Sequence, residues 1–330
     1  MIYQSCVLFL IALFITYKLS GPSIKIGERF GLIDNFEERK INTRLLVRIG
    51  GLSLTIGFLI TYIIIIFISE FTNINYPNIN NFFLISIFIS LSAFILGFID
   101  DIKSLSPFIR LIFQLLIATF IWLIGIRIEN IDLSFLNAQI DFISLNKPLS
   151  YILSIIWICG LTNAINWLDG LDGLAASIVG IGSLTFGILN INFGNTAVGL
   201  ILIALSGSCF GFLILNIYPA KLIMGDGGSY FLGFNLGYLS ILGSNFDVNL
   251  NSSSIEVQKV HIFLFIFVIP LLDMIYVISY RIFKRVSPFY PDNNHLHHRL
   301  IKSGLNHKKV VNLIFVSNLL ICTSALFIFL

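Results

Sequence analysis

Charged side chains are scarce in this sequence of 330 residues. Lys, Arg, Asp and Glu together make up 11% of the chain, whereas hydrophobic residues make up 57%. A water-soluble domain with this composition would lack the polar residues needed to cover its surface. The composition therefore excludes an ordinary soluble domain and predicts an all-α polytopic integral membrane protein. The lipid bilayer is its expected partner, and no nucleic acid is expected.

Cysteine is also sparse. Cys6, Cys159, Cys209 and Cys322 lie inside apolar runs and lack the spacing of a metal or redox motif, so we interpret them as small membrane-embedded side chains. The N-terminus lacks the basic segment and small-residue cleavage site of a signal peptide, and residues 1–16 are expected to begin the first span. With neither an internal repeat nor a separate soluble region, the sequence predicts one domain over residues 1–330.

Ten apolar runs are long enough to be candidate membrane spans, since about 20 residues cross ~30 Å of hydrocarbon. They cover roughly residues 2–20, 50–69, 81–98, 108–127, 149–165, 172–190, 196–216, 228–243, 259–280 and 309–329. An even number of spans places both termini on the same side of the membrane.

The basic residues indicate which side is cytoplasmic. Seventeen of the 20 lysines and arginines fall in or beside one set of connections, and three fall in the other. The basic set comprises residues 21–49, 99–107, 166–171, 217–227 and 281–308. By the positive-inside rule this set is cytoplasmic, and both termini are periplasmic or extracellular. The expected location is the inner (plasma) membrane.

The outer connections carry fewer signals. Residues 128–145 alternate weakly between apolar and polar side chains, which predicts a short hairpin. Residues 244–254 are rich in Asn and Ser and are expected to form a simple loop.

Two long apolar runs, residues 149–161 and 174–189, are separated by a stretch that contains four polar residues spaced three apart. They are Asn163, Asn166, Asp169 and Asp172. On a straight α-helix, successive members drift by about 60°, so the first three share one broad face. In a tighter helix all four would align. Such a row is costly against lipid and is expected to face a site. The alternative is a helix end with an Asp-Gly turn.

Two further acidic clusters lie on the same predicted membrane face. Asp100 and Asp101 end the third span, where adjacent carboxylates need a cation, a metal or a shared proton. The alternative is an exposed, hydrated loop. Asp226 lies between glycines that permit close approach by a ligand, before a helix N-terminus that favours an anion. The alternative there is a simple turn.

A fourth cluster contains His295, His297 and His298, followed by Arg299. Adjacent histidines without a nearby cysteine suit a closed zinc site poorly, and the surrounding cations fit an anionic ligand better. A plain basic loop at the membrane surface is the alternative. Asp273, inside the ninth apolar run, is either a structural partner for a buried polar group or a functional residue.

These clusters combine oxygen ligands with nearby cations on one membrane face. Carboxylate and amide oxygens suit Mg²⁺, with Mn²⁺ as the alternative. Because Mg²⁺ usually binds one or two carboxylates together with substrate phosphates, the pattern indicates phosphoryl transfer from a nucleotide-linked substrate to a lipid.

The motifs resemble those of a known family. They are Asp100-Asp101 with Leu105-Ser106-Pro107, Asn163-x-x-Asn166-x-x-Asp169-Gly170, Met224-Gly225-Asp226-x-Gly228-Ser229, Ser287-Pro288-Phe289 with His295-x-His297-His298, and Glu38-Arg39-Lys40-Ile41 with Gly50-Gly51. In this order they resemble the polyprenyl-phosphate N-acetylhexosamine-1-phosphate transferases, the superfamily that also contains the peptidoglycan translocase MraY. The resemblance extends from about residue 30 to about residue 305.

The resemblance implies that undecaprenyl phosphate attacks the β-phosphate of a UDP-N-acetylhexosamine and UMP leaves. It implies catalytic roles for Asp100, Asp101 and Asp226, and a Mg²⁺ site at Asp226 and Asn166. Asp100 would orient or deprotonate the lipid phosphate, and Asp101 would support Asp100 or bind nucleotide. The implied substrate-binding residues are Asn163, Asn166, Asp169, Asp172, His295, His297, His298 and Arg299.

The histidine segment most resembles the branch that uses UDP-N-acetylglucosamine to initiate cell-envelope polysaccharides. The chain departs from the family pattern at Asn42, Val47 and Asn293. An MraY-type enzyme, a transferase for another N-acetylhexosamine and a membrane transporter are the alternatives. A transporter would be expected to carry matching motifs in two halves, which this sequence does not contain. The sequence leaves homodimerisation open.

Overall fold

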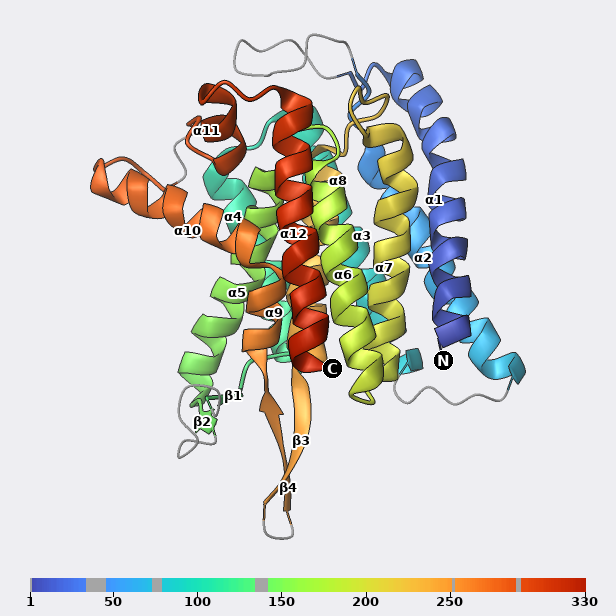
Figure 1. Cartoon of the computed structure of the whole chain (residues 1–330), viewed down its shortest axis with the longest axis vertical. Helices are drawn as coiled ribbons and strands as arrows, with labels where there is room; N and C mark the ends of the chain where they lie inside the picture. The colour runs from blue at the N-terminus through green and yellow to red at the C-terminus, as the bar shows by residue number, and fades with distance from the viewer. Residues whose placement is uncertain (1, 34–45, 73–78, 134–141, 251–252, 289–291) are drawn as a thin grey trace.

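Every apolar run forms helix in the structure, because backbone groups in lipid must form hydrogen bonds within their own segment. The computed structural model describes residues 2–33, 46–72, 79–133, 142–250, 253–288 and 292–330 (Figure 1). The helices are α1 (Ile2–Phe30), α2 (Gly50–Thr72), α3 (Ile79–Lys103), α4 (Pro107–Leu123), α5 (Lys147–Leu168), α6 (Leu174–Asn192), α7 (Thr196–Asn216), α8 (Gly225–Gly243), α9 (Val260–Ile266), α10 (Val268–Phe283), α11 (Leu296–Lys302) and α12 (His307–Phe329).

The chain is a polytopic helical membrane protein. Among the described residues, seven helices are long and apolar enough to span a membrane, or eight if α9 and α10 form one bent span. The expected ten spans are therefore not confirmed. Helix α4 has only 17 residues. Helix α8 has 19 residues, but its Gly-Asp-Gly-Gly-Ser start lowers its hydropathy, and it is not among these spans.

The ninth apolar run is not the continuous span that its composition predicts. It breaks at Phe267, and α10 turns 84° away from α9. Figure 1 shows α10 running sideways from the bundle. Pro270 lies in the first turn of α10, where its missing N–H cannot continue the hydrogen bonding of α9. After the break, Asp273 in the first half of α10 reaches the start of α11 at Leu296.

A small sheet lies at one end of the bundle, and both termini lie toward that end (Figure 1). Strands β1 (Asn130–Asp132) and β2 (Phe142–Ser144) pair antiparallel, which confirms the hairpin expected within residues 128–145. The simple loop expected over 244–254 is wrong, because β3 (Asn245–Leu250) and β4 (Ser253–Gln258) form a second hairpin. This segment alternates polar and apolar residues with a period of two, as strands do, but its many Asn and Ser residues are also typical of a loop. The sheet order is β2-β1-β4-β3.

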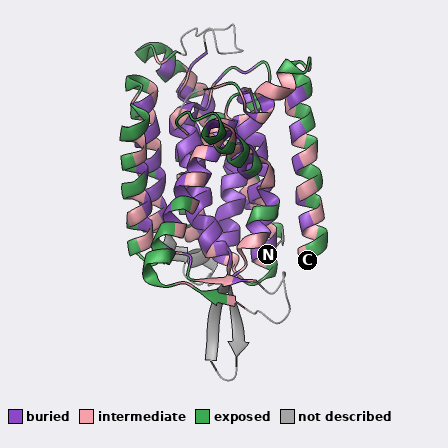
Figure 2. Ribbon diagram, turned by 90° about the vertical axis from the view of Figure 1, so that its left-hand side faces the viewer, coloured by how far each residue is buried: buried purple, intermediate pink, exposed green. Residues whose placement is uncertain are grey.

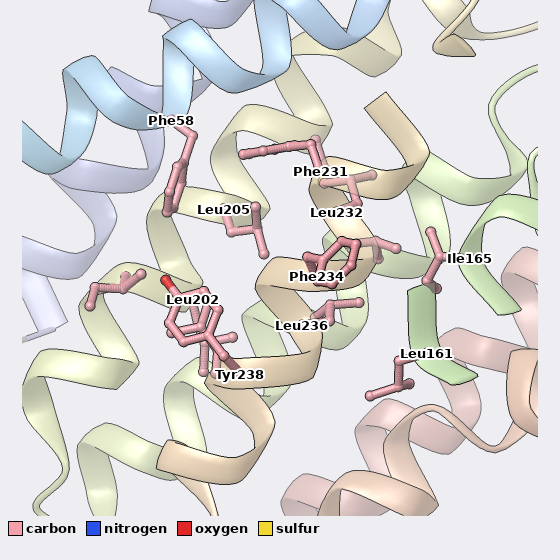
Figure 3. Close-up of a cluster of buried hydrophobic side chains, with 14 of the residues drawn as sticks. Phe58, Leu161, Ile165, Leu202, Leu205, Phe231, Leu232, Phe234, Leu236 and Tyr238 are labelled. Carbon is pink, nitrogen blue, oxygen red and sulfur yellow. The ribbon is translucent and has the colours of Figure 1, made fainter. Parts of the chain in front are cut away.

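Helix α8 lies inside the bundle. Nearly all of its residues are buried, and the central helices are the most buried part of the molecule (Figure 2). Figure 3 shows Phe231, Phe234 and Tyr238 of α8 among side chains from α2, α5 and α7. This enclosed position fixes the N-terminus of α8, and therefore Asp226, relative to the neighbouring helices.

Glycine permits the close contact between α8 and α5. A Cβ atom at Gly233 would collide with the backbone of Thr162, whereas one at Gly21 in α1 would meet nothing within 4 Å. Gly233→Ala is therefore expected to destabilise the protein by about 1–3 kcal/mol through overpacking, and Gly21→Ala is the matched control. Thermal unfolding in detergent measures both. Equal melting temperatures for the two variants would contradict this packing.

Candidate active site

A pocket of about 280 Å³ lies between α4, α5 and the segment that joins α10 to α11. This end of the bundle is opposite the sheet (Figure 1). The polar side chains that line it are Arg110, Gln114, Asn163, Asn166, Asp169, Arg281, Asp292, His295, His297 and His298. All four predicted polar clusters therefore contribute to one region. Two line the pocket directly, the Asp100 cluster adjoins it through Arg110, and the Asp226 cluster adjoins it through Asn166.

Asp226 begins the acidic part of the site. Its Oδ1 accepts a hydrogen bond from Asn166 Nδ2 at 2.8 Å, and its Oδ2 lies 3.1 Å from Arg48 Nη2. Asn166 also donates to Ser229 Oγ at 2.9 Å. The Asp226 side chain is 19% exposed. It is therefore held in place from two directions and remains accessible to solvent.

Asp101 holds the first turn of α8. Its carboxylate accepts the backbone N–H groups of Asp226 at 2.9 Å and Gly227 at 3.0 Å. Arg48 Nε lies 2.8 Å from the same carboxylate. These N–H groups are among those that an α-helix leaves unpaired at its N-terminus, where negative charge is favoured. The buried carboxylate of Asp101 and the partly exposed Arg48 thus hold the start of α8 at Asp226.

Both carboxylate oxygens of Asp100 accept hydrogen bonds. Its Oδ1 accepts the Leu105 N–H at 2.8 Å, and its Oδ2 accepts from the Tyr230 hydroxyl at 3.1 Å and from Arg110 Nη1 at 3.2 Å. Ser106 caps the N-terminus of α4, with Pro107 following, and this start sets the position of Arg110 one turn later. Arg110 lines the pocket. Asp100 therefore connects α3 to a cationic side chain that faces the site.

The four polar residues predicted to form a row at the end of α5 do not all face the pocket. Asn163 donates to Gln114 Oε1 at 2.8 Å, which links α5 to α4. Helix α5 ends at Leu168, so Asp169 caps the helix and lines the pocket. Asp172 instead accepts the backbone N–H of Ala220 at 3.0 Å. The fourth residue of the predicted row therefore braces a neighbouring loop and does not line the pocket.

The three histidines of the cluster line one side of the pocket. The His297 side chain is buried, and neither of its ring nitrogens has a hydrogen-bond partner within the described part of the chain. Burial, reinforced by His298 and His295, lowers the pKa of His297 to about 3, so its ring is neutral at pH 7. Arg299, predicted to bind substrate, lies against the ring of Tyr276 at 3.9 Å and is not part of the pocket lining.

Arg281 is the second cation of the pocket. It is bound by Asp292, with distances of 3.0 Å and 3.2 Å to the two carboxylate oxygens, and lies 5.1 Å from the ring of Trp167. Partial burial opposes ionisation of Asp292, but hydrogen bonds from Arg281 and Asn294 outweigh it and lower the pKa of Asp292.

Burial raises the pKa of Asp169; Arg48 opposes that shift, and Asp226 reinforces it. The pocket thus holds fixed cations beside acidic groups.

The donor set at Asp226 and Asn166 fits Mg²⁺. In the described ranges, no three His, Cys, Asp or Glu side chains are grouped as in a metal cage. Mg²⁺ does not require such a cage, because it keeps several waters and binds one or two carboxylates together with substrate phosphates. One partly exposed carboxylate and one amide on adjacent helices match that pattern.

Several site residues were not predicted from the sequence. Arg48 and Arg110 were used there only to orient the chain, and Gln114 and Asp292 were not selected. A signal existed for Gln114: it is a polar residue in an apolar run, four positions after Arg110 and therefore on the same helix face. No comparable signal connects Arg48 with Asp101, because their contact depends on the tertiary fold.

The helical bundle and its pocket of acids, amides, arginines and histidines define a polytopic membrane protein with an enzyme-like site suited to an anionic ligand. Comparison with known proteins gives the family. Residues 82–244 match the model of glycosyl transferase family 4. A probable undecaprenyl-phosphate N-acetylglucosaminyl 1-phosphate transferase of Bacillus subtilis is 31% identical over 97% of this chain and 84% of its own. The chain belongs to glycosyl transferase family 4.

Other relatives carry related activities in their names. A phospho-N-acetylmuramoyl-pentapeptide-transferase of Staphylococcus carnosus is 32% identical over 82% of this chain and 81% of its own. A decaprenyl-phosphate N-acetylglucosaminephosphotransferase of Mycobacterium tuberculosis is 27% identical over 93% and 78%, respectively. These relatives share phosphosugar transfer and differ in the sugar and the polyprenyl acceptor.

Proposed function

We propose that this protein transfers N-acetylglucosamine 1-phosphate from UDP-N-acetylglucosamine to undecaprenyl phosphate and releases UMP. The observation that carries the proposal is the convergence of Asp226, Asn166, Arg110 and Arg281 on one end of a membrane-embedded bundle. The Bacillus subtilis relative, which aligns with 97% of the chain, supports the proposal because its name gives the same acceptor and the same transferred group. The lipid-linked sugar would initiate a cell-envelope polysaccharide.

The proposed topology has ten membrane crossings in the plasma membrane. Helix α8 would cross inside the bundle, the largely exposed α4 would cross at its edge, and α9 with α10 would form one bent crossing. The pocket would then face the cytoplasm, where UDP-sugars are made, and both termini would lie outside. Accumulation of Lys and Arg at the pocket end supports this orientation.

In the proposed reaction, an oxygen of the lipid phosphate attacks the β-phosphorus of the UDP-sugar. The bond from that phosphorus to the bridging oxygen breaks, and the bridging oxygen leaves with UMP. Arg110, held by Asp100, is placed to neutralise the lipid phosphate, and Arg281, held by Asp292, is placed beside the diphosphate. When bound at Asp226 and Asn166, Mg²⁺ would supply further charge neutralisation at the diphosphate.

A second candidate is transfer of the muramoyl-pentapeptide phosphosugar. The 32% identity to the Staphylococcus carnosus relative favours it. The second activity requires a donor whose sugar is N-acetylmuramoyl and carries a pentapeptide, so purified protein tested with each donor distinguishes the two.

Removal of divalent metal is expected to abolish UMP release. The purified protein is incubated with UDP-N-acetylglucosamine and undecaprenyl phosphate, first with EDTA and then with added Mg²⁺ or Mn²⁺. We expect UMP only when lipid, UDP-sugar and metal are all present, because the site depends on charge neutralisation. Undiminished UMP release in EDTA would reject the metal assignment, and release without lipid would reject the acceptor.

A further inference from the structure

Asp273 is a buried carboxylate on an otherwise apolar helix. It lies on the inner face of α10 with Val277 and Arg281, whereas Leu272 and Ile275 on the other faces are exposed. A carboxylate in such a position is costly unless it is fully hydrogen-bonded. Its partners therefore indicate why the chain carries an acid here.

Both oxygens of Asp273 bind the beginning of α11. Oδ1 accepts the backbone N–H of Leu296 at 2.7 Å, and Oδ2 lies 2.9 Å from His295 Nδ1. The first contact fixes the backbone at this point, and the second fixes the imidazole ring. The His295 ring also lies beside Trp167, with 5.4 Å between ring centroids. The orientation of His295 is thus determined from three directions.

The contact with the ring exceeds what a helix start requires. The hydrogen bond from Leu296 N–H is sufficient to tie α11 to α10. The bond to Nδ1 has a separate effect, because it places the ring hydrogen on Nδ1 and leaves Nε2 as the free nitrogen. His295 lines the pocket. When a phosphate oxygen approaches Nε2, that nitrogen must carry a proton, and the carboxylate on Nδ1 compensates the resulting positive charge.

We propose that Asp273 is a positioning residue for the sugar-nucleotide donor, acting through His295. It holds the ring through Nδ1–H, and its negative charge supports the doubly protonated ring that donates Nε2–H to the diphosphate. This inference rests on the proposed function for the identity of the ligand. Its geometric part, the tautomer of His295, does not depend on that function.

Activity tests the coupling. Asp273→Asn keeps an acceptor for Leu296 N–H but removes the charge and turns an NH₂ group toward Nδ1, which reverses the tautomer. We expect kcat/KM for UDP-N-acetylglucosamine to fall about 10–100-fold, as for other residues that orient a ligand-binding imidazole. Because Asp273 acts through His295, the double variant Asp273→Asn/His295→Gln should be no less active than His295→Gln alone. Asp132→Asn, at a buried carboxylate in the sheet, is the matched control.

Nitrogen-15 NMR of histidine-labelled protein tests the tautomer directly. The His295 signals are identified by their loss in His295→Gln. We expect a protonated Nδ1 in the wild type and a protonated Nε2 with a bare Nδ1 in Asp273→Asn. A neutral Nε2–H tautomer in the wild type, or losses of activity that multiply in the double variant, would overturn the inference. If the wild type transfers no phosphosugar, the proposed function fails, while the spectra still decide the role of Asp273.

Discussion

Asp226→Asn is expected to reduce turnover by at least about 1,000-fold while leaving the protein folded and membrane-inserted. The substitution removes the negative charge of a partly exposed carboxylate that accepts a hydrogen bond from the Asn166 amide. Asparagine has nearly the same shape and can still bind Arg48 or Asn166 through its oxygen. The expected loss is therefore one of metal and phosphate binding, measured as UMP release.

The control for this variant is Asp132→Asn. It makes the same chemical change at a buried carboxylate in β1, at the end of the molecule opposite the pocket. We expect wild-type turnover from it. Turnover of Asp226→Asn within a few-fold of the wild type, with comparable expression and melting temperature, would be incompatible with Asp226 as the metal ligand.

Asp100→Asn is expected to lower kcat/KM for undecaprenyl phosphate by about 10–100-fold, the range for losing a charge-assisted hydrogen bond. Both oxygens of Asp100 already accept hydrogen bonds, including the one from Arg110. A phosphomonoester, with a second pKa near 6, is largely dianionic at neutral pH and needs no general base. Asp100 holds Arg110 in the structure, and Arg110 is the residue that we propose binds the lipid phosphate.

A double-variant comparison separates this role from base catalysis. Arg110→Gln should cause a loss of similar size, and Asp100→Asn/Arg110→Gln should be little worse than either single variant. Arg127→Gln, which removes an arginine paired with Glu129 near the sheet, is the matched control. Base catalysis by Asp100 predicts a different result. Asp100→Asn would then lower only kcat, and its loss would multiply with that of Arg110→Gln in the double variant.

Much of the architecture could be predicted because hydropathy acts locally. The ten apolar runs all became helix, and the four polar clusters met at one end of the bundle. The bend at Phe267 could not be predicted in the same way. The sequence is apolar on both sides of it, and hydropathy does not show whether two apolar segments continue in a straight line. The hairpin of β3 and β4 was missed because its polar composition concealed its alternation.

The candidate site shows the same division. Asn166 and Asp169 were selected because amides and acids in an apolar run are costly without a function. Both line the pocket, and their binding of metal or substrate stays a prediction. The adjacent acids Asp100 and Asp101 looked equivalent in sequence. In the structure they have different partners: Asp100 binds Arg110 of α4, whereas Asp101 binds the N-terminus of α8. Such contacts join residues far apart in the chain and follow only from the packing of α3 against α4 and α8.

The central claim is that a phosphosugar, and not a sugar alone, moves to the lipid. UDP-N-acetylglucosamine labelled with ³²P in its β-phosphate tests this most directly, with undecaprenyl phosphate as acceptor and the products separated into organic and aqueous phases. The account predicts labelled lipid and unlabelled UMP in equal amounts, because the bond that breaks joins the β-phosphorus to the bridging oxygen. Labelled UDP in the aqueous phase with unlabelled lipid product would show that the glycosidic bond breaks, and would contradict the account.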